Sequence, residues 1–92
     1  MKKAKLAEGY FIEFERLFTI PADWQDHAGV GDYVCSLRDA KDRRLDRVKL
    51  GFGSGMSREE EAWWFGRSYL LNEAKIAEDK IIALVDLEWT SY

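Results

Sequence analysis

The chain has 92 residues, of which 47% are hydrophobic, 34% charged and 14% aromatic, and it contains a single proline. This length fits one small domain, and this composition excludes a disordered tail, a collagen-like repeat and a low-complexity linker. The longest purely apolar run, Ile81–Val85, is too short for a membrane-spanning helix or a signal-peptide core. A lone cysteine excludes an internal disulfide and a CxxC motif, so we expect a cytoplasmic protein.

The net charge of −3 conceals a segregated distribution. Residues 1–9 carry a net charge of +2, and we expect them to form a basic, flexible terminus. Residues 38–49 carry +3, whereas the segments 10–37 and 50–92 carry −4 each. The overall acidity argues against nonspecific nucleic-acid binding, which depends on neutralising phosphates, but the basic segment could still bind locally.

Three segments show the alternation of apolar and polar residues that is typical of half-buried strands. The first is Tyr10–Ile20, and a proline-initiated loop over residues 21–31 follows it. The second strand is predicted at Tyr33–Leu37 and the third at Val48–Phe52. Because a short polar turn separates the second and third strands, we expect them to pair as a hairpin.

A helix is predicted to begin directly after the glycine-rich segment 51–55. Ser57 and Glu60 form an S-x-x-E capping box, in which each side chain accepts a hydrogen bond from the other residue's unpaired backbone N–H. We expect the helix to run to about Glu78 and a final strand to occupy Ile81–Trp89, where apolar residues alternate again.

The predicted order is β-β-β-α-β, within a single domain that spans residues 1–92. This is an α+β fold, with a small antiparallel sheet of about four strands and one helix packed on one face. The exposed edge of such a sheet could pair with a second copy of the chain, so a homodimer is one option.

The predicted helix carries more large aromatic side chains than one face can bury. One interpretation of the spacing buries a broad arc that includes Phe65 and Tyr69, and the other buries a stripe through Trp63, Gly66 and Leu70. The two interpretations leave different aromatic residues in surplus. At least one large aromatic must therefore be exposed or covered by another part of the chain.

In the first interpretation, Trp64 and Leu71 lie opposite the buried arc, two turns apart on one face, with Arg67 beside them. Exposed tryptophan and arginine are typical of binding hot spots, so we interpret these residues as a partner-binding surface. The alternatives are that the loop at 21–31 or the N-terminal segment covers Trp64, or that the surplus aromatics line a small-molecule pocket.

A second candidate surface is the basic strip of the third strand. Arg43, Leu45, Arg47 and Lys49 are predicted to alternate along one side of this strand, where they could contact RNA, DNA or an acidic protein groove. The alternative is a solvated face that neighbouring carboxylates neutralise. RNA-binding sheets usually place aromatics between their basic residues, and this strip offers only Leu45.

The sequence contains no convincing catalytic or metal-binding pattern. His27 and Cys35 are the only histidine and cysteine, and we expect a solvated histidine and a buried, unreactive thiol. The glycine-rich segment completes neither a phosphate-binding nor a nucleophile motif. The carboxylate pairs Glu13/Glu15 and Asp86/Glu88 are predicted on the solvent sides of strands. We therefore expect a protein without enzymatic activity, cofactor or metal.

The small size, the acidity and the α+β layout resemble the inhibitor proteins of the anti-CRISPR type, which phages and mobile elements encode. The resemblance rests on no motif and assigns no residues. It implies a non-enzymatic protein-binding module in the host cytoplasm, which blocks a nucleic-acid-binding or protein–protein surface of a host defence complex. A small RNA- or DNA-binding domain that uses the basic strip, and an immunity or antitoxin-type protein, are the alternatives.

Overall fold

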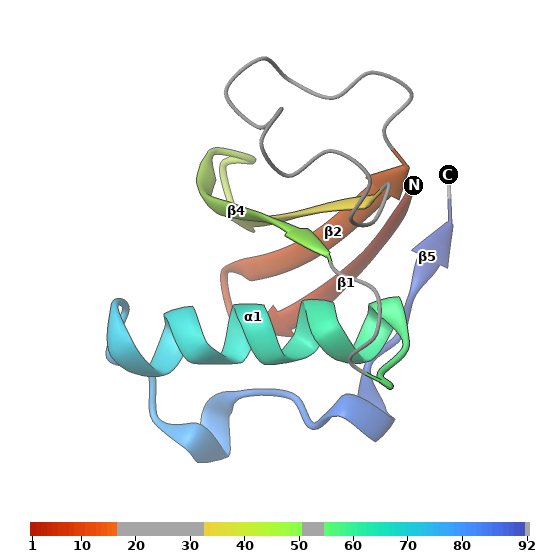
Figure 1. Cartoon of the computed structure of the whole chain (residues 1–92). Helices are drawn as coiled ribbons and strands as arrows, with labels where there is room; N and C mark the ends of the chain where they lie inside the picture. Colours follow the sequence, from red (N-terminus) through yellow and green to blue (C-terminus); the bar gives the residue numbers. More distant parts are fainter. Residues whose placement is uncertain (17–32, 51–54, 92) are drawn as a thin grey trace.

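The computed structural model describes residues 1–16, 33–50 and 55–91, and these form a five-stranded antiparallel sheet with one helix across a face (Figure 1). The α+β class is confirmed, with five strands where four were predicted. The elements are β1 (Lys2–Ala7), β2 (Tyr10–Arg16), β3 (Tyr33–Asp39), β4 (Arg44–Leu50), the helix α1 (Arg58–Asn72), the short 3₁₀ helices η2 (Glu78–Lys80) and η3 (Leu84–Asp86), and β5 (Thr90–Ser91).

The N-terminal residues form a strand and not the flexible terminus that their charge predicted. β1 lies between β2 and β5 in the sheet order β4-β3-β2-β1-β5. Its apolar residues Ala4 and Leu6 are buried, while Lys3 and Lys5 alternate with them. A two-residue turn joins β1 to β2, and Gly9 adopts a positive φ of 81°, a conformation that glycine reaches without steric cost. Only half of the residues in β1 are apolar and the others are lysines, so the alternation did not predict a strand here.

The strands β2 and β3 occupy the positions predicted for them, although β2 is described only as far as Arg16. Their register places Ile12 opposite Leu37 and Phe14 opposite Cys35, and all four side chains are buried. β4 begins at Arg44, earlier than predicted. The end of the first predicted strand, the loop 21–31 and the glycine-rich residues 51–54 lie outside the described residues.

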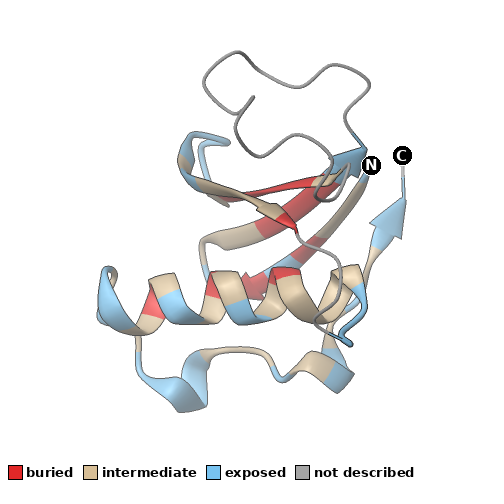
Figure 2. Ribbon diagram, viewed as in Figure 1, coloured by how far each residue is buried: buried red, intermediate tan, exposed pale blue. Residues whose placement is uncertain are grey.

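The Ser57 cap begins α1 where it was predicted. The Ser57 Oγ accepts a hydrogen bond from the Glu60 backbone N–H over 3.1 Å. A narrow stripe of small and medium-sized residues, Ala62, Gly66 and Leu70, is buried against the sheet (Figure 2). A Cβ atom on Gly66 would lie 2.5 Å from the Leu6 Cδ2, so the absence of a side chain lets the helix approach the sheet closely.

The helix ends at Asn72 and not near Glu78, because the chain reverses at Lys75. This residue has a φ of 57°, and the Ile76 N–H bonds to the Leu70 carbonyl over 2.8 Å. The following segment, residues 76–89, then runs back alongside α1, on the side away from β4 (Figure 1). This segment joins the helix to β5, which is paired with β1 at Lys2 and Lys3.

The final strand predicted at Ile81–Trp89 is wrong, since these residues contain the 3₁₀ helix η3 and only Thr90–Ser91, which follow them, pair as a strand. The apolar alternation does not correspond to one buried face. Ile81, Leu87 and Trp89 pack against the core, but Val85 is 90% exposed. One backbone hydrogen bond ties the segment to the sheet, from the Ile82 N–H to the Leu6 carbonyl at 2.8 Å.

Candidate partner-binding surface

The outer side of α1 presents a paired tryptophan cluster. Trp63 is half-buried, and its indole N–H donates a 2.8 Å hydrogen bond to the Ile82 carbonyl, which fixes the ring between the helix and the C-terminal segment. The Trp64 ring meets the Trp63 ring edge-on at 4.9 Å between centroids, and Trp64 remains 47% exposed. Trp64 therefore lies against a ring that is itself held in place.

Arg67 completes this cluster from one turn further along the helix. Its guanidinium lies 5.6 Å from the Trp63 ring centroid and 5.4 Å from that of Trp64, within the range of a cation–π contact. Its Nη2 also donates to the Glu78 carboxylate at 2.7 Å. Arg67 thus orients Trp64, and its charge is already partnered within the chain.

Leu71 is half-buried and lies two turns beyond Trp64 on the same side of the helix. We call Trp64, Arg67 and Leu71 the Trp64 surface, and these are the three helix residues that the sequence indicated. Cover for the aromatic cluster comes from the segment after α1, through the Trp63–Ile82 hydrogen bond. The loop 21–31, which was the alternative cover, lies outside the described residues.

The basic strip of β4 does not form the continuous row that was predicted. The register shifts between Leu37 and Arg38, so that Leu37 pairs with Asp46 and Arg38 pairs with Arg44. This bulge inserts Leu45 as an extra residue, and Leu45 packs against the core. The predicted position of Leu45 beside the basic side chains is therefore wrong.

Arg47 and Lys49 pair with Ser36 and Val34, respectively, which places them on the sheet face away from α1. Both are half-buried and both make contacts of their own. Arg43 lies apart from them in the β3–β4 turn, with its side chain 70% exposed. The Trp64 surface and the basic residues thus occupy different sides of the molecule.

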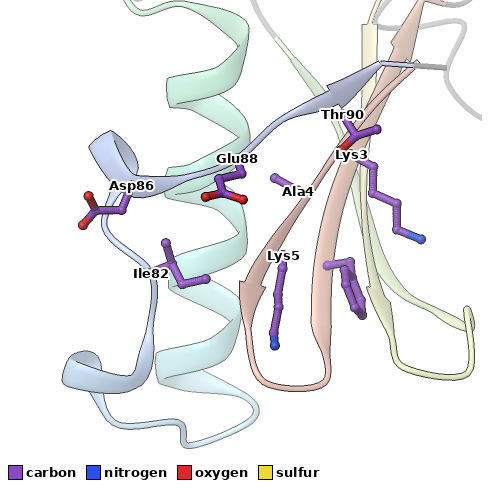
Figure 3. Close-up of a pocket in the computed structure, with 8 residues that line it drawn as sticks. Lys3, Ala4, Lys5, Ile82, Asp86, Glu88 and Thr90 are labelled. Carbon is purple, nitrogen blue, oxygen red and sulfur yellow. The ribbon is translucent and has the colours of Figure 1, made fainter.

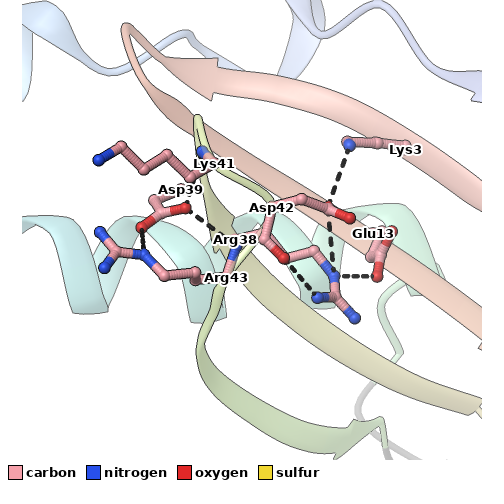
Figure 4. Close-up of polar contacts among 7 residues, drawn as sticks. All are labelled: Lys3, Glu13, Arg38, Asp39, Lys41, Asp42 and Arg43. Atoms are coloured by element: carbon pink, nitrogen blue, oxygen red, sulfur yellow. Dashed lines mark hydrogen bonds and ion pairs between the residues drawn. The ribbon is translucent and has the colours of Figure 1, made fainter.

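The β3–β4 turn binds its own charges in a network (Figure 4). The Arg43 Nε donates to the Asp39 carboxylate at 2.8 Å, and the other carboxylate oxygen accepts the backbone N–H groups of Lys41 and Arg43. These bonds lower the pKa of Asp39 below its ordinary value, with the Arg43 backbone N–H as the largest cause. Arg43 is therefore engaged in holding the turn.

Arg38 forms the second half of the network. Its Nε binds the Glu13 carboxylate, and its Nη1 donates to the Asp42 carbonyl at 3.0 Å (Figure 4). Glu13 was predicted on the solvent side, but the residue is only 9% exposed. The Glu13 carboxylate therefore lies in an ion pair with Arg38 and is not freely solvated.

The remaining candidates for chemistry are the lone cysteine and the lone histidine. Cys35 is fully buried, and burial raises the pKa of its thiol above the ordinary value, so the thiolate is suppressed. His27 lies outside the described residues. Within the residues that the structure describes, no group of three metal-ligating side chains converges, and no helix is long and apolar enough to cross a membrane.

The carboxylates Asp86 and Glu88 lie beside a cavity of about 590 Å³ between β1 and the C-terminal segment (Figure 3). They were predicted on the solvent side of a strand, and both are exposed, but they lie in and after η3. In Figure 3 Glu88 and Ile82 project towards β1, whereas the Asp86 carboxylate points away from it. The two carboxylates therefore do not converge on one point.

Sequence reasoning did not identify the two residues that organise the Trp64 surface. Glu78 was expected at the helix end and Ile82 in a strand, but both lie beside the helix and bind Arg67 and Trp63. No local pattern indicates this, because the contacts depend on the reversal at Lys75. The surplus of aromatics was the one available signal.

Comparisons of the chain with protein-family models, with curated proteins and with solved structures found no match.

Proposed function

We propose that the chain is a non-enzymatic protein-binding module that docks through the Trp64 surface. The observation that carries this proposal is the half-exposed Trp64 ring, which rests on Trp63 and Arg67. Tryptophan is enriched among the few residues that supply most of the energy at protein interfaces. A ring that is already positioned loses less conformational entropy on binding than a mobile one.

The proposed partner has an apolar pocket for the Trp64 indole. Arg67 is already paired with Glu78, so the surface presents the tryptophan ring without an uncompensated cation beside it. Hydrophobic burial of the ring, and not charge attraction, therefore supplies the main binding energy in this proposal. Binding should accordingly depend only weakly on salt.

The partner class that we propose is a subunit of a host defence complex, in line with the resemblance to inhibitors of the anti-CRISPR type. Size, acidity and the α+β layout support this class. An immunity or antitoxin-type role would use the same surface in the same way. In either case the site acts by occupying a partner's surface, with no chemical step.

The alternative, an RNA- or DNA-binding domain that uses Arg43, Arg47 and Lys49, receives less support from the geometry. Arg43 is tied to Asp39, and the bulge separates it from the other two residues. If this alternative holds, replacing all three with alanine abolishes a strongly salt-dependent binding to nucleic acid.

The test of the proposal is affinity capture from a host extract, with the full-length protein and two variants as baits. Trp64→Ala removes the central ring, and Val85→Ala is the matched control, because it removes an exposed apolar side chain outside the Trp64 surface. The wild type and the control should retain the same protein, and Trp64→Ala should lose it. For the purified partner, we expect the Kd to rise about 30-fold, the size of a hot-spot effect.

Circular dichroism should show the same folded spectrum for all three baits. If no protein is retained, or if Trp64→Ala retains it as well as the wild type does, the proposed function is wrong.

A further inference from the structure

The two edges of the sheet differ in whether another segment of the chain pairs with them. The β1 edge is covered, because β5 pairs with Lys2 and Lys3 and the Ile82 N–H bonds to Leu6. The opposite edge is β4, and within the described part of the chain no strand pairs with its outer side. An open edge presents a row of backbone N–H and C=O groups that can accept another strand.

A groove of about 280 Å³ lies directly beneath this edge, between β4 and α1. Asp46 faces it from β4, since the register places this residue on the same side as the buried Leu37. The helix contributes the half-buried rings of Phe65 and Tyr69, together with the exposed Glu73 at its end. The lining of the open groove thus combines two aromatic rings of α1 with one carboxylate from β4 and one from the residue that caps the helix.

This lining suits a cationic side chain with an aliphatic stem. The stem of a lysine or arginine packs on aromatic rings, and the charged head is attracted to ring faces and to carboxylates. Asp46 and Glu73 make no ion pair with any residue that the structure describes, and the one hydrogen bond of Asp46 is to the adjacent Arg47 N–H. The Asp46 Oδ2 and the Glu73 carboxylate are thus available to a cation from outside.

We propose that the outer edge of β4 is a strand-addition site for an extended segment of a partner protein, whose lysine or arginine side chains enter the groove between β4 and α1. Backbone pairing supplies the affinity, and alternate side chains supply the specificity, because every second residue of the added strand faces the groove. This site is separate from the Trp64 surface.

A second copy of the chain is a poor occupant. An antiparallel β4–β4 pair centred on Arg47 would place this residue opposite itself, and a pair centred on Asp46 would do the same with a carboxylate. Like charges directly opposite one another destabilise a strand pair. A foreign strand with cations towards the groove avoids this conflict.

The experiment titrates the isotope-labelled full-length protein with a capped peptide of alternating arginine and valine. We expect chemical-shift changes in the backbone amides of Arg44–Leu50 and in the Phe65 and Tyr69 rings. Hydrogen exchange in β4 should slow at the same time. A matched peptide with glutamate in place of arginine should bind at least about tenfold more weakly, because its charges oppose those of the groove.

The double variant Asp46→Asn/Glu73→Gln should bind the arginine peptide about tenfold more weakly, which corresponds to about threefold for each exposed charge pair. Asp86→Asn is the matched control, since it removes an exposed carboxylate outside the groove and should leave the affinity unchanged. N-methylation of the peptide backbone, which blocks strand pairing, should also reduce the affinity.

Equal binding of the arginine and glutamate peptides would overturn the proposal, as would absence of binding or shift changes confined to other elements. A concentration-dependent dimer that perturbs β4 without peptide would favour a second copy as the occupant and would equally overturn it. Trp64→Ala should bind the arginine peptide as the wild type does, so failure at one surface is distinguishable from failure at the other.

Discussion

The two faces of α1 have different roles: the inner face packs on the sheet, and the outer face carries an exposed aromatic side chain. The inner face is a stripe of Ala62, Gly66 and Leu70, whose small size lets the helix lie against the sheet. The outer face carries Trp64, which is 47% exposed and is supported by Trp63 and Arg67. Trp64 is bulkier than any residue of the inner stripe, yet it lies on the outer face, where it contributes less to the core.

This difference shows that the largest side chains of the helix are not the most deeply buried ones. The inner face packs closely because Gly66 has no side chain, and the two tryptophan side chains lie towards the outer face. The C-terminal segment covers only part of this tryptophan pair, through the hydrogen bond to Trp63. Substitutions on the inner face should therefore affect stability, and those on the outer face should affect binding.

The largest effect on stability is expected from Leu70→Ala, compared with Leu71→Ala on the other side of the helix. Leu70 is fully buried, so its truncation creates a cavity and should cost about 2–5 kcal/mol of unfolding free energy. Leu71 is half-buried, and its truncation should cost at most about 1.5 kcal/mol. Urea unfolding of the two variants measures the difference, and equal losses would contradict the contrast between the faces.

Gly66→Ala should be the next largest, with a loss of about 1–3 kcal/mol from overpacking. Alanine normally stabilises a helix relative to glycine, but here its Cβ would meet the Leu6 Cδ2 at 2.5 Å and the Ile12 Cγ2 at 2.7 Å. Ser68→Ala is the control, because Ser68 lies on the exposed side of α1, where alanine should be neutral or slightly stabilising. A Gly66→Ala variant that melts at or above the wild-type temperature would show that the helix has room to move outwards.

Trp63→Phe keeps an aromatic ring and removes the N–H that binds the Ile82 carbonyl. The half-buried carbonyl then lacks this donor, so we expect a loss of about 1–2 kcal/mol. Amide hydrogen exchange should accelerate at Ile82, whose own N–H bonds to Leu6, while the amides of β3 remain as protected as in the wild type. Uniform acceleration across the sheet would instead indicate that Trp63 belongs to the core.

The ion pair between Lys2 and Glu59 links the sheet to the start of the helix at 2.8 Å. The hydrogen bond from Lys2 is the largest cause that lowers the pKa of Glu59 below its ordinary value of 4.5. Because the folded-state pKa is depressed, the contribution of the pair is fully present above pH 4.5 and is lost as the pH falls through the lowered pKa.

Lys2→Met should therefore return the Glu59 pKa towards its ordinary value and reduce stability at neutral pH by less than about 1 kcal/mol, since the pair is partly exposed. The two proteins should converge in stability as the pH falls below the lowered pKa of Glu59, where the carboxylate is protonated in both. Lys5→Met is the control, because Lys5 pairs with Glu8 in the β1–β2 turn. Carboxyl NMR titration of Glu59 measures the shift, and an unchanged Glu59 pKa in Lys2→Met would refute the assignment.

The fold was predictable from local patterns at the helix cap and in β2, but not at Ile81–Trp89, where the apolar alternation predicted a strand that does not form. The Ser57 cap and the alternation through Ile12 and Phe14 each rest on a few neighbouring residues, and the structure confirms them. β1 was missed because its lysines outnumber its large apolar residues, and half of a strand that faces away from the core is free to be charged. Patterning alone does not separate such a strand from a basic tail.

The candidate site was predictable only in part, since its key contacts are nonlocal. Counting the aromatics on one helix predicted only that at least one of them is exposed or covered by another segment. The Arg67–Glu78 pair and the Trp63–Ile82 bond require the reversal at Lys75. A positive φ at a lysine has no signature in the sequence. The bulge at Leu45 is likewise decided by the pairing partner, and it broke the predicted basic row.

The smallest effect on stability, and the sharpest test of the comparison, is expected from Trp64→Ala. Because Trp64 packs mainly on Trp63 and Arg67 at the surface, its truncation should change the unfolding free energy by no more than about 0.5 kcal/mol. Arg67 keeps its bond to Glu78, so the C-terminal segment should remain in place. If thermal unfolding instead shows a loss as large as that of Leu70→Ala, Trp64 is a structural residue, and its 47% exposure does not mark a docking surface.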